Sequence, residues 1–348
     1  MEQLDKQIPA LLLPWYAENH RALPWRQSRE PYPVWLSEIM LQQTRVEAVK
    51  GYFTRFLQEL PTIRDLAACD PERLSKLWEG LGYYSRMRNL QKAAQVIAAQ
   101  YGGVFPQSYD AVRALPGIGD YTAGAICSIC FDLPTPAVDG NVLRLIARLT
   151  DDHRAVTEAV VKREYTARLA EIYPPEAGLF TQALMELGAT VCGPNKLPEC
   201  ERCPLAAICL SKKRGNQAAL PVKAAKKPRR VEEKTVFLLT CGGSLAVCKR
   251  PETGLLAGLW ELPNTEGTLE PAEALAFAER LGVQPTELYK MVEKIHIFTH
   301  VEWKMRCFYL ECAAPKGSLV WVDRARLDAD VALPTAFKMF LAQNAPQL

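Results

Sequence analysis

A basic segment that contains prolines divides the chain into two parts with different patterns of apolar residues. Residues 212–234 hold nine Lys and Arg against two Glu, and Pro221 and Pro228 oppose regular structure there. Before this segment, apolar residues recur at steps of three and four, which predicts helices. These stretches are 33–60, 72–79, 87–100, 121–131, 139–149, 156–172 and 176–190. Residues 1–211 should therefore form a mainly helical region.

After residue 234 the pattern predicts strands. Runs rich in β-branched and aromatic residues stand at 236–240, 244–250, 289–298, 303–310 and 319–322, and helical patterns stand at 270–281 and 335–344. We therefore expect a separate α+β domain at 235–348, of about 110 residues, which is an ordinary domain size. Residues 212–234 then form an interdomain linker.

The composition excludes two classes of protein. Hydrophobic residues make up 49% of the 348 residues, which is too many for a disordered chain, and the apolar runs are too short for a membrane span. The first residues lack a basic start and a small-residue cleavage site, so we expect a cytoplasmic protein with no membrane partner. The net charge is only +3. The basic segment suits a phosphate backbone, and equally a solvated linker.

Four of the eleven cysteines lie close together in the sequence, with the spacing C-x7-C-x2-C-x5-C: Cys192, Cys200, Cys203 and Cys209. In a cytoplasmic chain, cysteines are more often thiols or metal ligands than disulfides. Four thiolates suit an iron–sulfur cluster or a zinc ion. Paired zinc knuckles usually show two separate C-x2-C halves, and this loop has one such half, so the spacing favours iron and sulfur.

Three strings in the helical region carry residues suited to chemistry on DNA. Gly117 and Gly119, in L-P-G-I-G-D-Y-T-A (115–123), can expose backbone N–H groups to a phosphate, although a Gly-x-Gly is usually only a turn. Asp139, in A-V-D-G-N-V (137–142), can cap the following helix or serve as a catalytic carboxylate. Glu38 lies in W-L-S-E-I-M-L-Q-Q-T (35–44), and an arbitrary glutamate of this kind is usually solvated.

Together these strings resemble the adenine DNA glycosylases of the MutY type, in the endonuclease III or helix-hairpin-helix superfamily. The hairpin, the aspartate and the cysteine loop follow one another in the order of that family, and the resemblance extends from about residue 11 to 340. It implies a helix-hairpin-helix glycosylase fold with a six-helix barrel at about 25–132. It also implies an iron–sulfur subdomain made of residues 1–24 and 133–211.

Residues 244–263 resemble the strand and loop of a Nudix domain, which that family carries to recognise oxidised guanine. A Nudix hydrolase holds divalent metal on a helix rich in glutamate. The helical pattern at 270–281 lacks the paired glutamate set. We therefore expect a Nudix-like C-terminal domain without pyrophosphatase activity.

The resemblance implies a DNA repair enzyme that excises adenine mispaired with 8-oxoguanine or guanine in double-stranded DNA. Adenine is a poor leaving group, so an acid must protonate it while a second carboxylate stabilises the cationic sugar. Glu38 would be the acid, and Asp139 the stabiliser or transient nucleophile. Asn141 and Tyr121 would orient Glu38 and the sugar. Superfamily members that also nick the strand have a lysine at position 121, and Tyr121 lacks an amine, so we expect little or no nicking.

Further residues take their expected roles from the same resemblance. The four cysteines would ligate a [4Fe–4S] cluster, although their first gap has seven residues where the family usually has six. Arg26 would line the adenine pocket or contact a phosphate, and Gln43 and Tyr83 would act as wedges in the DNA stack, with a core position as the alternative for Tyr83. Thr299 and His300, in F-T-H (298–300), would read the oxidised guanine or else lie on a strand surface.

We expect a monomer that associates with the bacterial nucleoid while it is on DNA. Three alternatives remain at this point: a bifunctional glycosylase of the endonuclease III type, a non-catalytic iron–sulfur protein that binds DNA or senses redox state, and a Nudix nucleotide hydrolase. Tyr121 and the extra domain argue against the first. Glu38 and Asp139 argue against the second, and the missing glutamate set argues against the third.

Overall fold

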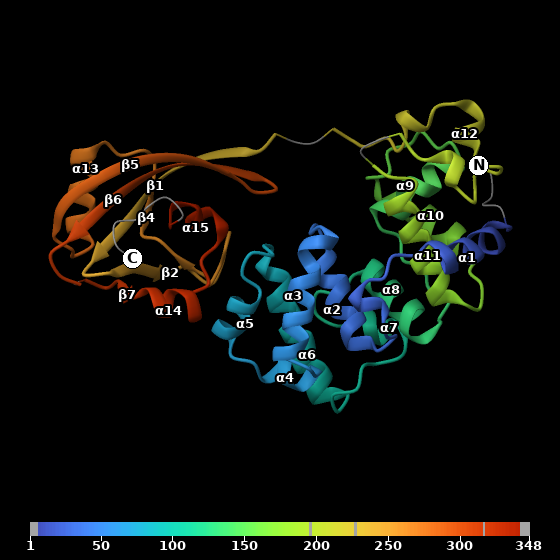
Figure 1. Cartoon of the computed structure of the whole chain (residues 1–348), viewed down its shortest axis with the longest axis horizontal. Coiled ribbons are helices and arrows are strands. Elements are labelled where there is room, and N and C mark those ends of the chain that lie inside the picture. Colours follow the sequence, from blue (N-terminus) through green and yellow to red (C-terminus); the bar gives the residue numbers. More distant parts are fainter. Residues whose placement is uncertain (1–5, 195–196, 226–227, 316, 342–348) are drawn as a thin grey trace. The chain divides into compact units, whose positions relative to one another are not determined.

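The structure is a computed structural model that describes residues 6–194, 197–225, 228–315 and 317–341 (Figure 1). Its contacts divide the chain into two compact units, residues 1–68 with 88–225, and residues 69–87 with 226–348. Lys226 and Lys227 of the basic segment lie outside the described residues. In the part of the chain that is described, no helix is both long and apolar enough to cross a membrane.

The first unit is built from helices (Figure 1). They are α1 (Ile8–Asn19), α2 (Pro31–Leu41), α3 (Val46–Glu59), α4 (Ile63–Ala68), α6 (Tyr84–Gln100), α7 (Tyr109–Arg113), α8 (Asp120–Phe131), α9 (Gly140–Leu149), α10 (Ala159–Ala170), α11 (Ala177–Thr190) and α12 (Leu210–Arg214), with short 3₁₀ turns at Pro24–Arg26, Cys200–Arg202 and Gln217–Ala219. The predicted helical region is confirmed.

The stretch 33–60 is helical, as predicted, and it forms two helices. Helix α2 ends at Leu41 and α3 begins at Val46. Between them Gln43 takes a positive φ of 59°, and the Thr44 N–H donates to the Leu41 carbonyl in a turn. The polar run Gln42-Gln43-Thr44 gives neither helix an apolar surface to continue on, so the chain changes direction there.

An apolar core in the first unit packs the start of α9 against α11. Leu145 and Ile146 of α9 are buried with Leu184 and other apolar residues of α11. The two backbones approach closely at Gly188, where an added Cβ would lie 2.7 Å from the Cβ of Asn141. Any larger residue at position 188 would therefore push on Asn141.

The second unit contains a seven-stranded mixed sheet. Its strands are β1 (Arg230–Cys241), β2 (Ser244–Lys249), β3 (Trp260–Glu261), β4 (Asn264–Glu266), β5 (Pro285–Ile297), β6 (Val301–Cys312) and β7 (Val320–Val322), and its helices are α5 (Pro71–Leu77), α13 (Pro271–Arg280), α14 (Arg324–Ala329) and α15 (Thr335–Leu341). The main strand order is β3-β2-β1-β6-β5, with β4 on β1 and β7 on β2. Strands β1 and β6 run parallel. The predicted α+β domain is confirmed.

Apolar side chains cover both faces of this sheet. Ala274 and Ala278 of α13 pack with Phe237 on one face. On the other face, Phe337 of α15 packs with Trp303 of β6. The predicted strand at 236–240 is longer than expected, because β1 begins at Arg230 and pairs with β6 from that residue onward. The expected linker therefore ends in a strand. The last three residues of the predicted helix 335–344 lie outside the described residues.

Residues 69–87 come from the first half of the chain but pack within the second unit. The Lys76 ammonium of α5 donates to the carbonyls of Leu327 and Val331, each at 3.1 Å. The Leu333 N–H donates to a carboxylate oxygen of Glu79 at 3.1 Å. These contacts satisfy backbone groups of the C-terminal segment, so this interface is specific.

Candidate active site

A cleft of about 1250 Å³ opens within the first unit. Three helices bring predicted site residues to it: α2 carries Glu38, α8 carries Tyr121, and the start of α9 carries Asp139 and Asn141. A cleft of this size can enclose a nucleobase with its sugar. Residues far apart in the sequence therefore form one site.

Glu38 is a buried acid with one strong hydrogen bond. Its helix is buried on nearly all sides, and the glutamate itself is only 7% exposed. The Tyr121 hydroxyl donates to Glu38 Oε2 at 2.6 Å. Burial raises the pKa of Glu38 to about 7, the nearby charge of Asp139 adds to the rise, and the Tyr121 bond opposes it. A carboxyl group with such a pKa can give up a proton near neutral pH.

Tyr121 serves this arrangement as a donor. Burial and the charges of Glu38 and Asp139 raise the pKa of the Tyr121 phenol well above its usual value. The phenol therefore keeps its proton and directs it at Glu38, which fixes the orientation of the carboxyl group.

Asp139 caps helix α9, as its sequence position predicts. Its Oδ1 accepts the backbone N–H groups of Asn141 and Val142, each at 2.8 Å, and its Oδ2 accepts the Asn141 side-chain amide at 2.7 Å. Burial raises the pKa of Asp139, while these three hydrogen bonds act against the rise. The carboxylate is thus held in a single orientation at the edge of the cleft.

A chain of hydrogen bonds continues from Asn141 to the cysteine loop. Arg144 donates to Asn141 Oδ1 at 2.8 Å and to the Cys192 carbonyl at 2.7 Å. Arg148, one turn later, donates to the Cys192 sulfur at 3.2 Å. Side chains of the one helix α9 therefore hold both Asp139 and the cysteine loop in place.

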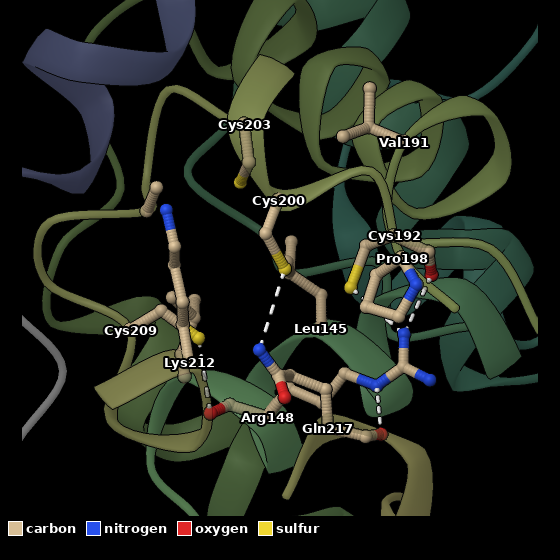
Figure 2. A pocket seen from close by; sticks show the side chains of 12 residues that line it. Leu145, Arg148, Val191, Cys192, Pro198, Cys200, Cys203, Cys209, Lys212 and Gln217 are labelled. Carbon is tan, nitrogen blue, oxygen red and sulfur yellow. Dashed lines mark hydrogen bonds between the residues drawn. The ribbon is translucent and has the colours of Figure 1, made fainter. Parts of the chain in front are cut away.

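The four clustered cysteines line one small pocket in the first unit (Figure 2). Leu145, Val191 and Pro198 supply apolar walls. The Gln217 side-chain amide approaches the Cys200 sulfur at 3.7 Å. Across the described residues, no set of three His, Cys, Asp or Glu is arranged to hold a single metal ion. The pocket nevertheless gathers four cysteine sulfurs, two of which accept hydrogen bonds from N–H groups. Lys196 of this loop lies outside the described residues.

Glu186 is a site residue that sequence reasoning missed. It lies on α11, is fully buried and lines the same cleft. Arg26 and Arg21 pair with its two oxygens at 2.7 Å and 2.6 Å. Burial alone would raise the pKa of Glu186, but the two arginines hold it at about 2. The signal in the sequence is one acid in the apolar run A-L-M-E-L-G, because such a residue needs a buried partner.

The two glycines of the hairpin, Gly117 and Gly119, differ in their structural roles. Gly117 has a φ of +75°, and a Cβ there would lie 2.5 Å from the Cβ of Asn89. Gly119 caps α8 with an ordinary φ and lines the cleft. Gln43 also lines the cleft, from the turn after α2. Thus Gly117 is required by the fold, while Gly119 and Gln43 border the site itself.

Three predicted site residues belong to the second unit. The Tyr83 hydroxyl and the Thr299 hydroxyl lie 2.9 Å apart, and both side chains are exposed. Thr299 and His300 form the turn between β5 and β6. Below them Phe298 packs edge-on against Trp303, with ring centres 4.9 Å apart. The exposed position of Tyr83 excludes the core alternative.

Comparison with known proteins decides the family. An adenine DNA glycosylase from Mus musculus is 36% identical, with 94% of this chain and 77% of that protein covered. A second adenine DNA glycosylase, from Buchnera aphidicola subsp. Schizaphis graminum, is 32% identical, with 95% and 96% covered. The chain belongs to the adenine DNA glycosylase family.

Two domain models match separate parts of the chain. Residues 36–171 match the HhH-GPD superfamily of base excision DNA repair proteins, and residues 235–343 match the NUDIX domain. A solved non-covalent complex of endonuclease III with DNA is similar to 61% of this chain, with 98% of that protein covered, 26% identity and a TM-score of 0.51. The resemblance expected from the sequence is confirmed, and the chain is a DNA repair enzyme.

The raised pKa of Glu38 predicts a pH-dependent stability. A folded-state pKa of about 7, above the ordinary 4.5, means that the folded protein binds the proton more tightly than the unfolded chain. The free energy of unfolding therefore falls as pH rises from 4.5 to 7, and stays lower above pH 7. Glu38→Gln removes this loss. Its stability relative to wild type should rise by about 2–3 kcal/mol between pH 5 and pH 8.

Chemical denaturation at both pH values measures this difference. Glu47→Gln, at an exposed position of α3, is the control and should show no such change. An equal effect of Glu38→Gln at pH 5 and pH 8 would mean that the carboxyl group has an ordinary pKa.

Proposed function

We propose that this protein excises adenine mispaired with 8-oxoguanine or guanine from double-stranded DNA by hydrolysing the N-glycosidic bond. The observation that carries the proposal is the pair of buried carboxyl groups in one cleft. Glu38 has a pKa of about 7, and Asp139 is held by three hydrogen bonds. One group can donate a proton while the other keeps a negative charge beside the sugar.

The steps follow from these two environments. The adenine leaves the base stack and enters the cleft. Glu38 transfers its proton to a ring nitrogen of the base, and the bond from the sugar to the base breaks with its electron pair leaving on adenine. Asp139 stabilises the resulting cationic sugar, directly or as a transient nucleophile. Water then adds to the sugar carbon, and its proton returns to the Glu38 carboxylate.

Tyr121 and Asn141 are positioning residues in this proposal. Tyr121 holds the Glu38 carboxyl group, and Asn141 holds the Asp139 carboxylate. Tyr121 has no amine that can attack the sugar, so the reaction ends at an abasic site. Arg26, held by Glu186, is suited to contact the edge of the adenine.

Replacing either carboxyl group should remove the activity. Glu38→Gln should reduce excision by at least ~10²–10⁴-fold, because the amide cannot donate the proton. Asp139→Asn should also be nearly inactive, because a neutral amide cannot offset a cationic sugar. The wild-type rate should fall as pH rises above 7, because Glu38 then loses its proton. The assay uses a duplex with one 8-oxoguanine:adenine pair. After the reaction the DNA is treated with alkali, and strand cleavage is measured.

A break at adenine only after alkali supports the proposal. Glu47→Gln is again the control and should keep wild-type activity. Breaks without alkali would favour the bifunctional alternative, and excision at wild-type rate by Glu38→Gln would remove Glu38 from the mechanism.

We further propose that Cys192, Cys200, Cys203 and Cys209 hold a [4Fe–4S] cluster. The donor set supports it: four thiols line one pocket with apolar walls, and Arg148 and Gln217 donate N–H groups to two of the sulfurs. The bound cluster would cross-link the loop to the end of α11. The residues around the cluster would then hold the loop at a fixed position relative to the start of α9.

Purified protein should therefore be brown and contain iron. Cys200→Ser should lose the visible absorption and lower DNA affinity or solubility. Cys241→Ser, outside the pocket, is the matched control and should keep its iron. Elemental analysis that finds zinc and no iron would contradict the cluster.

The turn between β5 and β6 is proposed to read the opposite base. Oxidised guanine differs from guanine by one oxygen and one N–H, and the exposed Thr299 hydroxyl can bond either. Tyr83, whose hydroxyl lies 2.9 Å from that of Thr299, is suited to enter the stack next to the lesion. His300, exposed beside Thr299, supplies a second polar group.

Replacing Thr299 should change discrimination between the two mispairs. Thr299→Val keeps the shape but removes the hydroxyl, and a lost group of this kind costs ~1–3 kcal/mol. The ratio of excision rates for 8-oxoguanine:adenine over guanine:adenine should fall about tenfold. Thr299→Ser keeps the hydroxyl and should retain the ratio. If Val and Ser behave alike, the lesion is read elsewhere.

A further inference from the structure

The cleft lined by Glu38 and Asp139 is called the adenine cleft below. A second cleft, with a volume of about 890 Å³, lies next to it in the first unit. Gly140, Asn141, Leu143 and Lys162 line both clefts, so the two are continuous past the start of α9. A strand of DNA that has its adenosine beside Asp139 can therefore pass from one cleft into the other.

The charges of the two clefts differ. The adenine cleft is lined by four basic and four acidic side chains, so their charges balance. Among the described residues, the second cleft is lined by Arg144, Arg148, Lys162 and Lys223 and by no acid. Its lining is therefore net positive, and a phosphate backbone is the anion that a DNA repair enzyme meets.

The two arginines contribute a fixed field. Arg144 and Arg148 are 6% and 5% exposed. They donate hydrogen bonds to carbonyl oxygens, the Asn141 amide oxygen and the Cys192 sulfur, and no carboxylate forms an ion pair with them among the described residues. The nearby Asp139 carboxylate offsets part of the Arg144 charge. The remaining positive charge acts on the second cleft, because the protein interior screens charges less than water does.

The two lysines are the groups that can touch a phosphate. Lys162 projects from α10 and is exposed, with no ion-pair partner in the described chain. Lys223 is exposed too, and its neighbours on both sides are anchored. The Val156 N–H donates to the Val222 carbonyl at 3.0 Å, and the Ala224 N–H donates to the Thr157 hydroxyl at 3.1 Å. The first part of the linker is therefore fixed, and it presents Lys223 at a defined place.

We propose that this second cleft binds the phosphate backbone of the adenine strand next to the excised nucleotide, with Lys162 and Lys223 as the phosphate contacts. The proposal rests on the proposed function. It gives the strand two holding points around the catalytic carboxylates, the hairpin at Gly119 and this cleft. Leu143, Leu220 and Pro221 of the cleft supply apolar surface for the sugars.

The test is the salt dependence of DNA binding. The probe is a duplex with one 8-oxoguanine:adenine pair, bound by protein with Glu38→Gln so that no product forms. Each phosphate contact contributes about 0.9 to the slope of log affinity against log salt. The double variant Lys162→Ala with Lys223→Ala loses two such contacts, so its slope should be shallower by about 1.8. The control pair, Lys50→Ala with Lys92→Ala, removes the same charge from α3 and α6, and should change the slope by much less.

A neutral methylphosphonate at each phosphate flanking the adenosine then locates the contact. In protein with both lysines, it should weaken binding on one side of the adenosine, and this loss should vanish in the double variant. Equal slopes for the double variant and the control pair would overturn the proposal. This outcome is independent of the alkali assay, because failure of the proposed function would appear as a wild type that releases no adenine.

Discussion

The candidate active site is built around a carboxyl group kept away from water. Helix α2 is surrounded by other helices, and Glu38 lies among its buried residues with the Tyr121 phenol as hydrogen-bond donor. In water such a group would be ionised at neutral pH, and burial moves its pKa to about 7. The helical packing that makes an acid available also makes the ionised form unfavourable, so this site carries a stability loss that serves function.

Asp139 shows how one side chain meets a structural and a chemical need. Its hydrogen bonds to the first N–H groups of α9 cap the helix, and the same bonds hold the carboxylate toward the cleft. Asn141, Arg144 and Arg148 extend this order to Cys192. Helix α9 therefore connects the cleft with the cysteine loop, and a change in that loop can reach Asp139 through these hydrogen bonds.

Charge separates the roles of neighbouring surfaces. Glu186 forms ion pairs with Arg21 and Arg26 in the cleft that we propose for the neutral adenine base. The second cleft has no such acid among its described residues, which suits a polyanion. In the other unit, the hydroxyls of Tyr83 and Thr299 meet although 216 residues separate them in the sequence. The packing of residues 69–87 with the C-terminal domain brings them together.

The helical and α+β regions, the family, the cap at Asp139 and the cysteine set can all be predicted from the sequence, because periodicity, capping and motif spacing are local properties. The remaining features depend on the tertiary structure. It turned the chain at Gln43, placed residues 69–87 on the C-terminal domain, and made Glu186 a buried partner of Arg26. It also determined the protonation of Glu38, because a pKa depends on burial and on charges brought from distant helices, and no local pattern records those distances.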